Sequence, residues 1–190
     1  KIFLSGGDTT FSNKLSFTIT SVGFSNRIIY RNKAKLNDDI YVTGNLGDSF
    51  TGLQILKNKI RVKKKIKHYF LNKYYLPDIH TTLAKQLLKF ANTSIDISDG
   101  LIDDLDKMIN KQNLSYIINE NNIPISKYLL NLIKKKKINR SNFISNGDDY
   151  QVLFTAHLNK TRIIENVSKA TGIKITKIGK IVSGKNRSLI

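Results

Sequence analysis

The sequence has 190 residues and no cysteine, and its 32 Lys and Arg against 14 Asp and Glu give a formal net charge of +18. Zero cysteine excludes disulfides, thiolate metal sites and a cysteine nucleophile, and it fits a cytoplasmic protein. No apolar run reaches the length of a membrane-spanning helix, and no signal peptide is visible. The charge suggests nucleic-acid binding, but abundant Ile and Asn indicate a codon bias that would make any surface basic.

The first 25 residues predict two strands joined by a glycine turn. Lys1–Leu4 is largely apolar, Gly6–Thr10 forms the turn, and Leu15–Phe24 alternates apolar with polar side chains. Because the chain starts without Met and in the middle of a strand, we expect it to be part of a longer protein. A Gly-Gly-Asp turn lets backbone approach a ligand while the carboxylate binds a cation, although the same residues also make ordinary turns.

A polar connection from Asn26 to Asp39 follows and is the most natural domain boundary. Its Arg31 could pair with a phosphate, or it could be a solvated charge. Asp39–Thr43 predicts a strand, followed by a glycine-containing loop and a helix that ends near Asn58. This order suits phosphate binding on backbone N–H groups, but the loop lacks the Gly-Lys-Ser/Thr ending of a P-loop.

Basic and aromatic residues alternate from Lys57 to Tyr75. This pattern could bind a single-stranded nucleic acid through charge and stacking. An amphipathic helix with its aromatic side chains in the core and its Lys side chains in solvent explains the same pattern. A further helix is predicted from Thr81 to Ala91.

The most informative stretch is Ser94–Leu105, which reads SIDISDGLIDDL. It predicts a short strand that passes into a helix at about Asp99, so that Asp96, Ser98 and Asp99 lie at the end of a strand and the start of a helix. Ligands of α/β folds bind at such positions, and carboxylates suit Mg²⁺ bound together with phosphates. Alternatively, Asp96 is a solvated strand end and Ser98 or Asp99 merely caps the helix.

The remaining segments alternate between strands and helices. An acidic turn at Ser145–Tyr150 leads into a strand, and this turn could contact a cationic ligand or reflect the ordinary composition of turns. The other predicted elements are a strand at Leu114–Ile118, a helix at Ile125–Lys136, a strand at Tyr150–Thr155, a helix at Lys160–Ala170 and one or two strands within Ile173–Val182.

Four motifs in this order resemble the thiamine-monophosphate kinase family. They are GGDTT at Gly6–Thr10, DDIYVTGNLGDS at Asp38–Ser49, SIDISDGLIDDL at Ser94–Leu105 and NGDDYQVLFT at Asn146–Thr155. The resemblance implies an ATP-dependent, Mg²⁺-assisted phosphorylation of thiamine monophosphate to thiamine diphosphate by a cytoplasmic homodimer that needs neither a membrane nor a nucleic acid.

The resemblance also implies roles for individual residues. Gly7, Asp8, Arg31 and Ser98 would contact ATP, and Asp8 would also bind Mg²⁺. Asp96 and Asp99 would complete the Mg²⁺ ligands, and we expect them to converge with Asp8. Asp148 would contact the thiamine phosphate, although it stands where the family has a Glu, which is one methylene longer.

The expected fold is α/β (α+β), with residues 1–25 as the last strand of an N-terminal ATP- and Mg²⁺-binding domain and residues 26–190 as a mixed-sheet C-terminal domain with packed helices. Family segments at both ends are missing from the sequence, so the chain by itself is expected to be inactive or nearly so. The alternatives are a non-catalytic basic module that binds nucleic acid, and a sibling ATP-dependent enzyme of the same superfamily.

Overall fold

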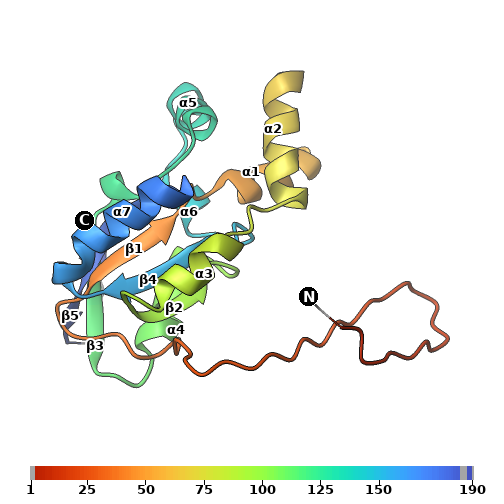
Figure 1. Ribbon diagram of the computed structural model, residues 1–190. Coiled ribbons are helices and arrows are strands. Elements are labelled where there is room, and N and C mark those ends of the chain that lie inside the picture. Colours follow the sequence, from red (N-terminus) through yellow and green to blue (C-terminus); the bar gives the residue numbers. More distant parts are fainter. Residues whose placement is uncertain (1–2, 185–187, 190) are drawn as a thin grey trace.

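The computed structural model describes residues 3–184 and 188–189, which form a folded body and an extended N-terminal arm (Figure 1). Six strands form one sheet in the order β2-β4-β1-β5-β3-β6. All neighbouring pairs are antiparallel except β3 and β6, which are parallel. This arrangement confirms the predicted mixed sheet. The strands are β1 (Asp39–Thr43), β2 (Ala91–Asp96), β3 (Leu114–Ile118), β4 (Val152–Ala156), β5 (Ile175–Ser183) and β6 (Ser188–Leu189).

Seven α-helices are found in the described part of the chain, and they pack on both faces of the sheet or beside it. None of them is long and apolar enough to cross a membrane. The helices are α1 (Asp48–Leu56), α2 (Lys64–Tyr75), α3 (Thr81–Leu87), α4 (Leu101–Ile109), α5 (Lys127–Lys136), α6 (Ser141–Ile144) and α7 (Thr161–Thr171).

Alternation along the strands divides the core between the two faces of the sheet. In β1, Ile40 and Val42 face α4, whereas Tyr41 faces α3 and α7 on the opposite side. Figure 1 shows the same two layers, with α3 and α7 on one side of the strands and α4 below. This follows from the two-residue period of a strand, which sends neighbouring side chains to opposite faces.

A third apolar cluster joins α1, α2, α5 and α6 beside the sheet. Phe70 of α2 is fully buried in it. Tyr69 lies against Tyr128 of α5 with ring centroids 4.6 Å apart. The amphipathic-helix interpretation of Lys57–Tyr75 is therefore confirmed for these two aromatic side chains, which are not available to stack on nucleic-acid bases.

The predicted strand at Leu15–Phe24 is wrong. This segment belongs to the N-terminal arm, and residues 3–38 contain no strand or helix, although Leu15–Phe24 alternates apolar with polar side chains as a strand does. Its apolar side chains are exposed, Phe17 by 82% and Phe24 by 99%. The predicted strand at Lys1–Leu4 lies partly outside the described residues, and its described part is not a strand either. A strand needs a neighbour for its backbone hydrogen bonds, and the arm is paired with no strand of the sheet.

Candidate active site

Three loops meet at one end of the sheet. β1 and β2 both pair antiparallel with β4, so they run in the same direction and end beside the start of β4. The β1–α1 loop is residues 44–47, the β2–α4 loop is residues 97–100, and the α6–β4 loop is residues 145–151. Strand-to-helix loops at one sheet edge are where open α/β sheets bind ligands.

The β2–α4 and α6–β4 loops are in direct backbone contact. The N–H of Asp148 donates to the carbonyl of Ser98 at 3.0 Å. A Cβ on Gly147 would lie 1.9 Å from that same carbonyl oxygen, and a Cβ on Gly100 would lie 2.2 Å from the carbonyl oxygen of Ser145. Since no side chain fits at such distances, the two glycines permit the contact.

Asp104 holds the β2–α4 loop in shape. Its fully buried carboxylate accepts three backbone N–H groups on Oδ2, from Ser98 at 3.0 Å, Asp99 at 3.1 Å and Gly100 at 3.2 Å. Its Oδ1 accepts from Lys107 Nζ at 2.7 Å, and Lys107 also pairs with Asp99. These bonds to Asp104 and Asp99 raise the pKa of Lys107, so the ammonium stays charged.

Asp149 ties the α6–β4 loop to the first turn of α1. Its Oδ2 accepts from Gly47 N at 2.7 Å and its Oδ1 accepts from Ser49 N at 3.2 Å. Burial raises the pKa of this carboxyl to about 7, while the two N–H bonds oppose the rise. A carboxylate at a helix N-terminus is also favoured by the helix dipole.

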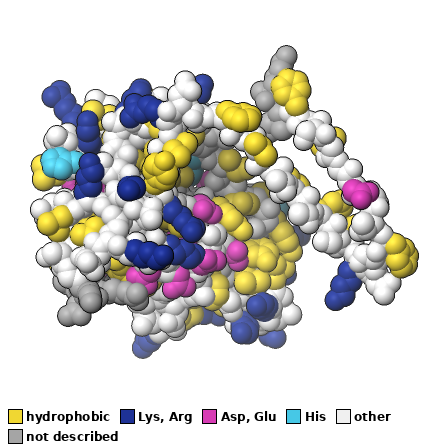
Figure 2. Space-filling view, turned by 90° about the horizontal axis from the view of Figure 1, so that it is seen from below, with side chains coloured by type: hydrophobic (Ala, Val, Ile, Leu, Met, Phe, Trp, Pro, Cys, Tyr) yellow, Lys and Arg dark blue, Asp and Glu magenta, His cyan; other side chains and the backbone are white. Residues whose placement is uncertain are grey.

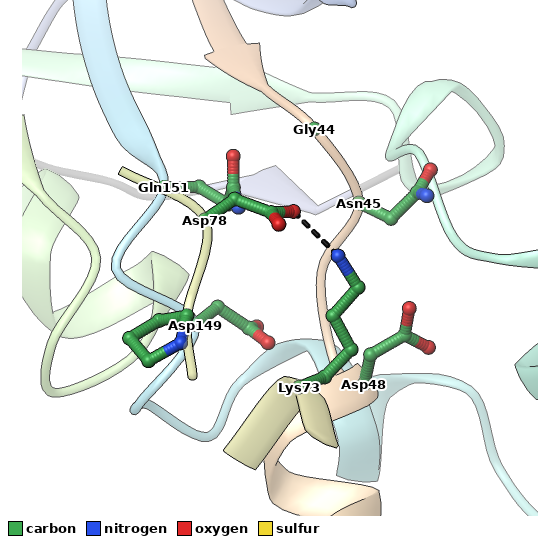
Figure 3. Close-up of a pocket in the computed structure, with 8 residues that line it drawn as sticks. Gly44, Asn45, Asp48, Lys73, Asp78, Asp149 and Gln151 are labelled. Atoms are coloured by element: carbon green, nitrogen blue, oxygen red, sulfur yellow. Dashed lines mark hydrogen bonds and ion pairs between the residues drawn. The ribbon is translucent and has the colours of Figure 1, made fainter. Parts of the chain in front are cut away.

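A small pocket lies where the β1–α1 and α6–β4 loops face the end of α2, and no residue of the β2–α4 loop lines it (Figure 3). Gln151 sits in its wall, and its Oε1 lies 2.8 Å from both Thr43 Oγ1 and His80 Nε2. Gly44 has a φ of +59°, and a Cβ there would lie 2.3 Å from Gln151 Oε1, so another residue would be strained and would displace the Gln151 side chain. The residues that line the pocket are Gly44, Asn45, Asp48, Lys73, Pro77, Asp78, Asp149 and Gln151.

The pocket carries more acidic than basic side chains, although the chain as a whole is strongly basic. Asp48 is buried and accepts from Ser126 Oγ at 2.6 Å and Tyr69 OH at 2.7 Å. Burial raises the pKa of Asp48, and burial beside Asp48 raises the pKa of Tyr69. Lys73 pairs with Asp78 at 2.6 Å across the pocket (Figure 3). Most of the charged side chains that line the pocket are therefore already hydrogen-bonded or ion-paired to other groups of the protein.

Four of the predicted site residues lie at this end of the sheet. Asp96 ends β2 and is exposed, Ser98 and Asp99 follow it in the β2–α4 loop, and Asp148 is joined to Ser98 through the backbone. The predicted order of strand, acidic loop and helix at Ser94–Leu105 is therefore confirmed. In the view from below, acidic side chains lie among Lys and Arg side chains on the face to which α4 belongs (Figure 2).

The other three predicted site residues lie elsewhere. Gly7 and Asp8 are exposed on the arm, which stands away from the body in both views (Figures 1 and 2). Arg31 is exposed in the connection that precedes β1. Among the described residues, no three His, Asp or Glu side chains are grouped as a metal site.

The expected convergence of Asp8 with Asp96 and Asp99 is therefore absent from this structure. The physical reason is the one that leaves the arm without a strand. The segment that carries Asp8 is not paired with any strand of the sheet, so no backbone hydrogen bonds position its carboxylate against the β2–α4 loop.

Sequence reasoning missed the buried acids Asp104 and Asp149. A signal for Asp104 was present, because residues 101, 104, 105 and 108 form an i, i+3, i+4, i+7 stripe of which it is the only charged member. A buried carboxylate on an apolar stripe needs donors, and the N–H groups at the start of its own helix supply them. For Asp149 no comparable local signal exists, because its partners lie about 100 residues earlier.

No family model matches the chain. A curated relative, the thiamine-monophosphate kinase of Buchnera aphidicola subsp. Acyrthosiphon pisum, is 37% identical over 182 residues, which is 94% of this chain and 55% of that protein. The chain is related to thiamine-monophosphate kinase. It spans about half the length of the curated relatives it matches.

Solved thiamine-monophosphate kinases show the same relationship in three dimensions. The crystal structure of the enzyme from Stenotrophomonas maltophilia K279a matches with a TM-score of 0.77 at 26% identity, over 85% of this chain and 52% of that one. AaThiL, solved in complex with AMPPCP and TMP, matches with a TM-score of 0.75 at 26% identity, over 87% of this chain and 51% of that one. The predicted resemblance and fold class are confirmed.

Proposed function

We propose that the protein containing this chain phosphorylates thiamine monophosphate to thiamine diphosphate with ATP. The similarity to thiamine-monophosphate kinases over almost the whole chain supports this activity, as does the complex of AaThiL with AMPPCP and TMP. The observation that carries the proposal is the placement of Asp96, Ser98, Asp99 and Asp148 at one end of the sheet.

The proposed roles follow the geometry of the loops. Asp96 and Asp99 are exposed, and carboxylate oxygens are the donors that Mg²⁺ takes when it binds together with substrate phosphates. With Asp8 from the arm, they would hold Mg²⁺. Asp99 Oδ2 is paired with Lys107, so Mg²⁺ would have to compete with that ammonium or use Asp99 Oδ1. Bound Mg²⁺ would neutralise charge on the transferring phosphoryl group.

The nucleotide would contact Gly7, Asp8, Arg31 and Ser98, and the thiamine phosphate would contact Asp148. One detail of the structure narrows how the loop contacts phosphate. The N–H groups of residues 98–100 all donate to Asp104. The hydroxyl of Ser98, together with any bound Mg²⁺, would therefore contact phosphate in place of these three amides.

The arm supports a proposal about domain organisation. In this proposal residues 1–25 are the end of an N-terminal ATP- and Mg²⁺-binding domain, and residues 26–190 are the C-terminal domain. The alternating apolar side chains of Leu15–Phe24, exposed here, would pack within the sheet of that first domain. It follows that the chain alone has little or no activity. The complete protein would be a cytoplasmic homodimer.

The experiment is Asp96→Asn in the complete encoded protein, with thiamine diphosphate formation measured against ATP and Mg²⁺ concentration. We expect turnover to fall at least about 100-fold, because removing one group that stabilises charge in the transition state typically slows an enzyme by this factor or more. Asp103→Asn is the matched control, because Asp103 is an exposed acid in the first turn of α4. Turnover of the Asp96→Asn protein equal to the wild type would overturn the metal assignment.

Product analysis distinguishes the proposed kinase from a sibling ATP-dependent enzyme of the same superfamily. If the complete protein is such a sibling, it will consume ATP with another phosphate acceptor and leave thiamine monophosphate unchanged. The nucleic-acid alternative loses two of its stacking side chains, because Phe70 is buried and Tyr69 packs on Tyr128, whereas Tyr75 is 61% exposed.

A further inference from the structure

An apolar groove with a basic rim lies between the start of α2 and the exposed side of α5. We call it the basic groove, and its volume is about 290 Å³. Its floor is formed by Val62, Ile66, Tyr128 and Leu132, and its rim by Arg61, Lys63, Asn131, Lys135 and Lys136. The rim Lys and Arg side chains are exposed to solvent. The groove lies on the helical cluster beside the sheet, and none of its residues belongs to the candidate active site.

The charge around the groove is concentrated beyond what a general codon bias explains. Residues 57–75 and 127–140 contain 14 of the 32 Lys and Arg residues of the chain and none of its 14 Asp and Glu residues. A bias acting on the whole sequence would spread Lys evenly, whereas these 33 residues hold nearly half of the total. A surface of one sign with an apolar centre attracts a partner of opposite charge.

We propose that the basic groove binds an acidic amphipathic helix of a partner protein. The apolar face of such a helix would place two or three aliphatic side chains on the floor between Ile66 and Leu132. Its Glu and Asp side chains would pair with Lys63 and Lys135 on opposite sides of the rim. Recognition of an amphipathic helix by a complementary groove is a recurring mode of protein interaction.

Other occupants fit the groove less well. Its volume of about 290 Å³ lies at the lower limit of the ~300–1,000 Å³ typical of small-molecule sites, so it would hold only a small ligand. Nucleic acid would find few stacking partners, because Phe70 is buried, Tyr69 is covered by Tyr128, and Tyr128 is the one aromatic side chain that lines the groove. A bilayer would need apolar side chains that protrude, whereas the floor of the groove is concave and Ile66 packs against the cluster beneath it.

The test is a fluorescence-anisotropy titration of the whole chain into a labelled peptide of about four helical turns, with Leu along one face and Glu elsewhere. The rim variant is Lys63→Glu with Lys135→Glu. The matched control is Lys85→Glu with Lys169→Glu, which reverses two exposed charges on α3 and α7. Circular dichroism establishes that both variants keep the helical content of the wild type.

We expect saturable binding at physiological ionic strength, weakened at least about tenfold by the rim variant, which corresponds to ~1.4 kcal/mol, and unchanged in the control. A peptide of the same composition with its Leu residues scattered should also bind at least about tenfold more weakly, because it has no apolar face for the floor.

Three results would overturn the proposal. The first is equal binding of the scattered peptide, and the second is equal weakening in the control variant. The third is tighter binding of a single-stranded oligonucleotide or of phosphatidylserine vesicles that the rim variant abolishes. None of these experiments measures kinase activity, so their outcome is independent of the proposed function.

Discussion

Removing the buried carboxylate of Asp104 should loosen the β2–α4 loop and destabilise the domain. In Asp104→Ala, the backbone N–H groups of residues 98–100 lose their shared acceptor. A hydrogen bond to a charged group contributes about 1.5–3 kcal/mol, but the three bonds share one oxygen and do not add fully. Breaking a buried charged network costs about 3–5 kcal/mol, and we expect the free energy of unfolding to fall by that amount.

The variant Asp104→Asn distinguishes the contribution of the three backbone hydrogen bonds from that of the contact with Lys107. The amide oxygen can still accept the three N–H groups, whereas the contact with Lys107 is lost. The Lys107 side chain is 36% exposed, so solvent screens its ion pair and the loss of this contact should contribute little. We therefore expect a loss of about 1–2 kcal/mol for this variant, including the replacement of a charged acceptor by a neutral one.

The assay is equilibrium unfolding of the whole chain in urea, followed by circular dichroism. Asp103→Ala is the control, because Asp103 is exposed in the same helical turn and should cost only about 0.3–1 kcal/mol through the helix dipole. If Asp104→Ala destabilised the protein no more than Asp103→Ala, Asp104 would not be holding the loop.

Three further predictions concern buried contacts at the same end of the sheet. Because the pKa of Asp149 is raised to about 7, the native state keeps a proton that the unfolded chain releases near pH 4. The free energy of unfolding should therefore decrease between pH 5 and pH 7 by about 2–3 kcal/mol more in the wild type than in Asp149→Asn, and an equal pH dependence in urea titrations would contradict this. Gly147→Ala should destabilise by about 1–3 kcal/mol or more, since its Cβ would lie 1.9 Å from Ser98 O, and urea unfolding with no loss would mean that the two loops separate freely. Tyr69→Phe should cost about 1–3 kcal/mol by removing a donor from the buried Asp48 carboxylate, and a thermal melt unchanged from the wild type would refute it.

The sheet and its helices were predictable because both partners of each contact lie in the chain. The strand at Asp39–Thr43 matches β1, the strand at Leu114–Ile118 matches β3, and the segment Tyr150–Thr155 overlaps β4. In each case an alternating or apolar run meets helices that present complementary apolar stripes, as α4 does below β1. Helix ends were less accurate, since the amphipathic pattern from Lys57 continues through a turn before α2 begins at Lys64.

The candidate site was predictable only in part. The pattern SIDISDG placed Asp96, Ser98 and Asp99 at the end of β2 and the start of α4, because strand alternation and helical periodicity are local properties. Contacts between distant segments have no such signature. The bond from Gly47 to Asp149 joins loops 102 residues apart, and nothing in either segment specifies the other.

The N-terminal arm shows that a segment with the alternating pattern of a strand does not form a strand without a neighbouring strand. Leu15, Phe17 and Ile19 alternate with polar residues as a half-buried strand requires, yet each of the three is at least 82% exposed. Alternation encodes which face a strand would bury, but the hydrogen bonds that make it a strand come from a neighbour. The edge strands of the sheet, β2 and β6, are not paired with the arm. A polypeptide that supplies a free edge to residues 15–24 should therefore both order the arm and fix the position of Asp8, so the same contact that completes the fold would complete the proposed metal site.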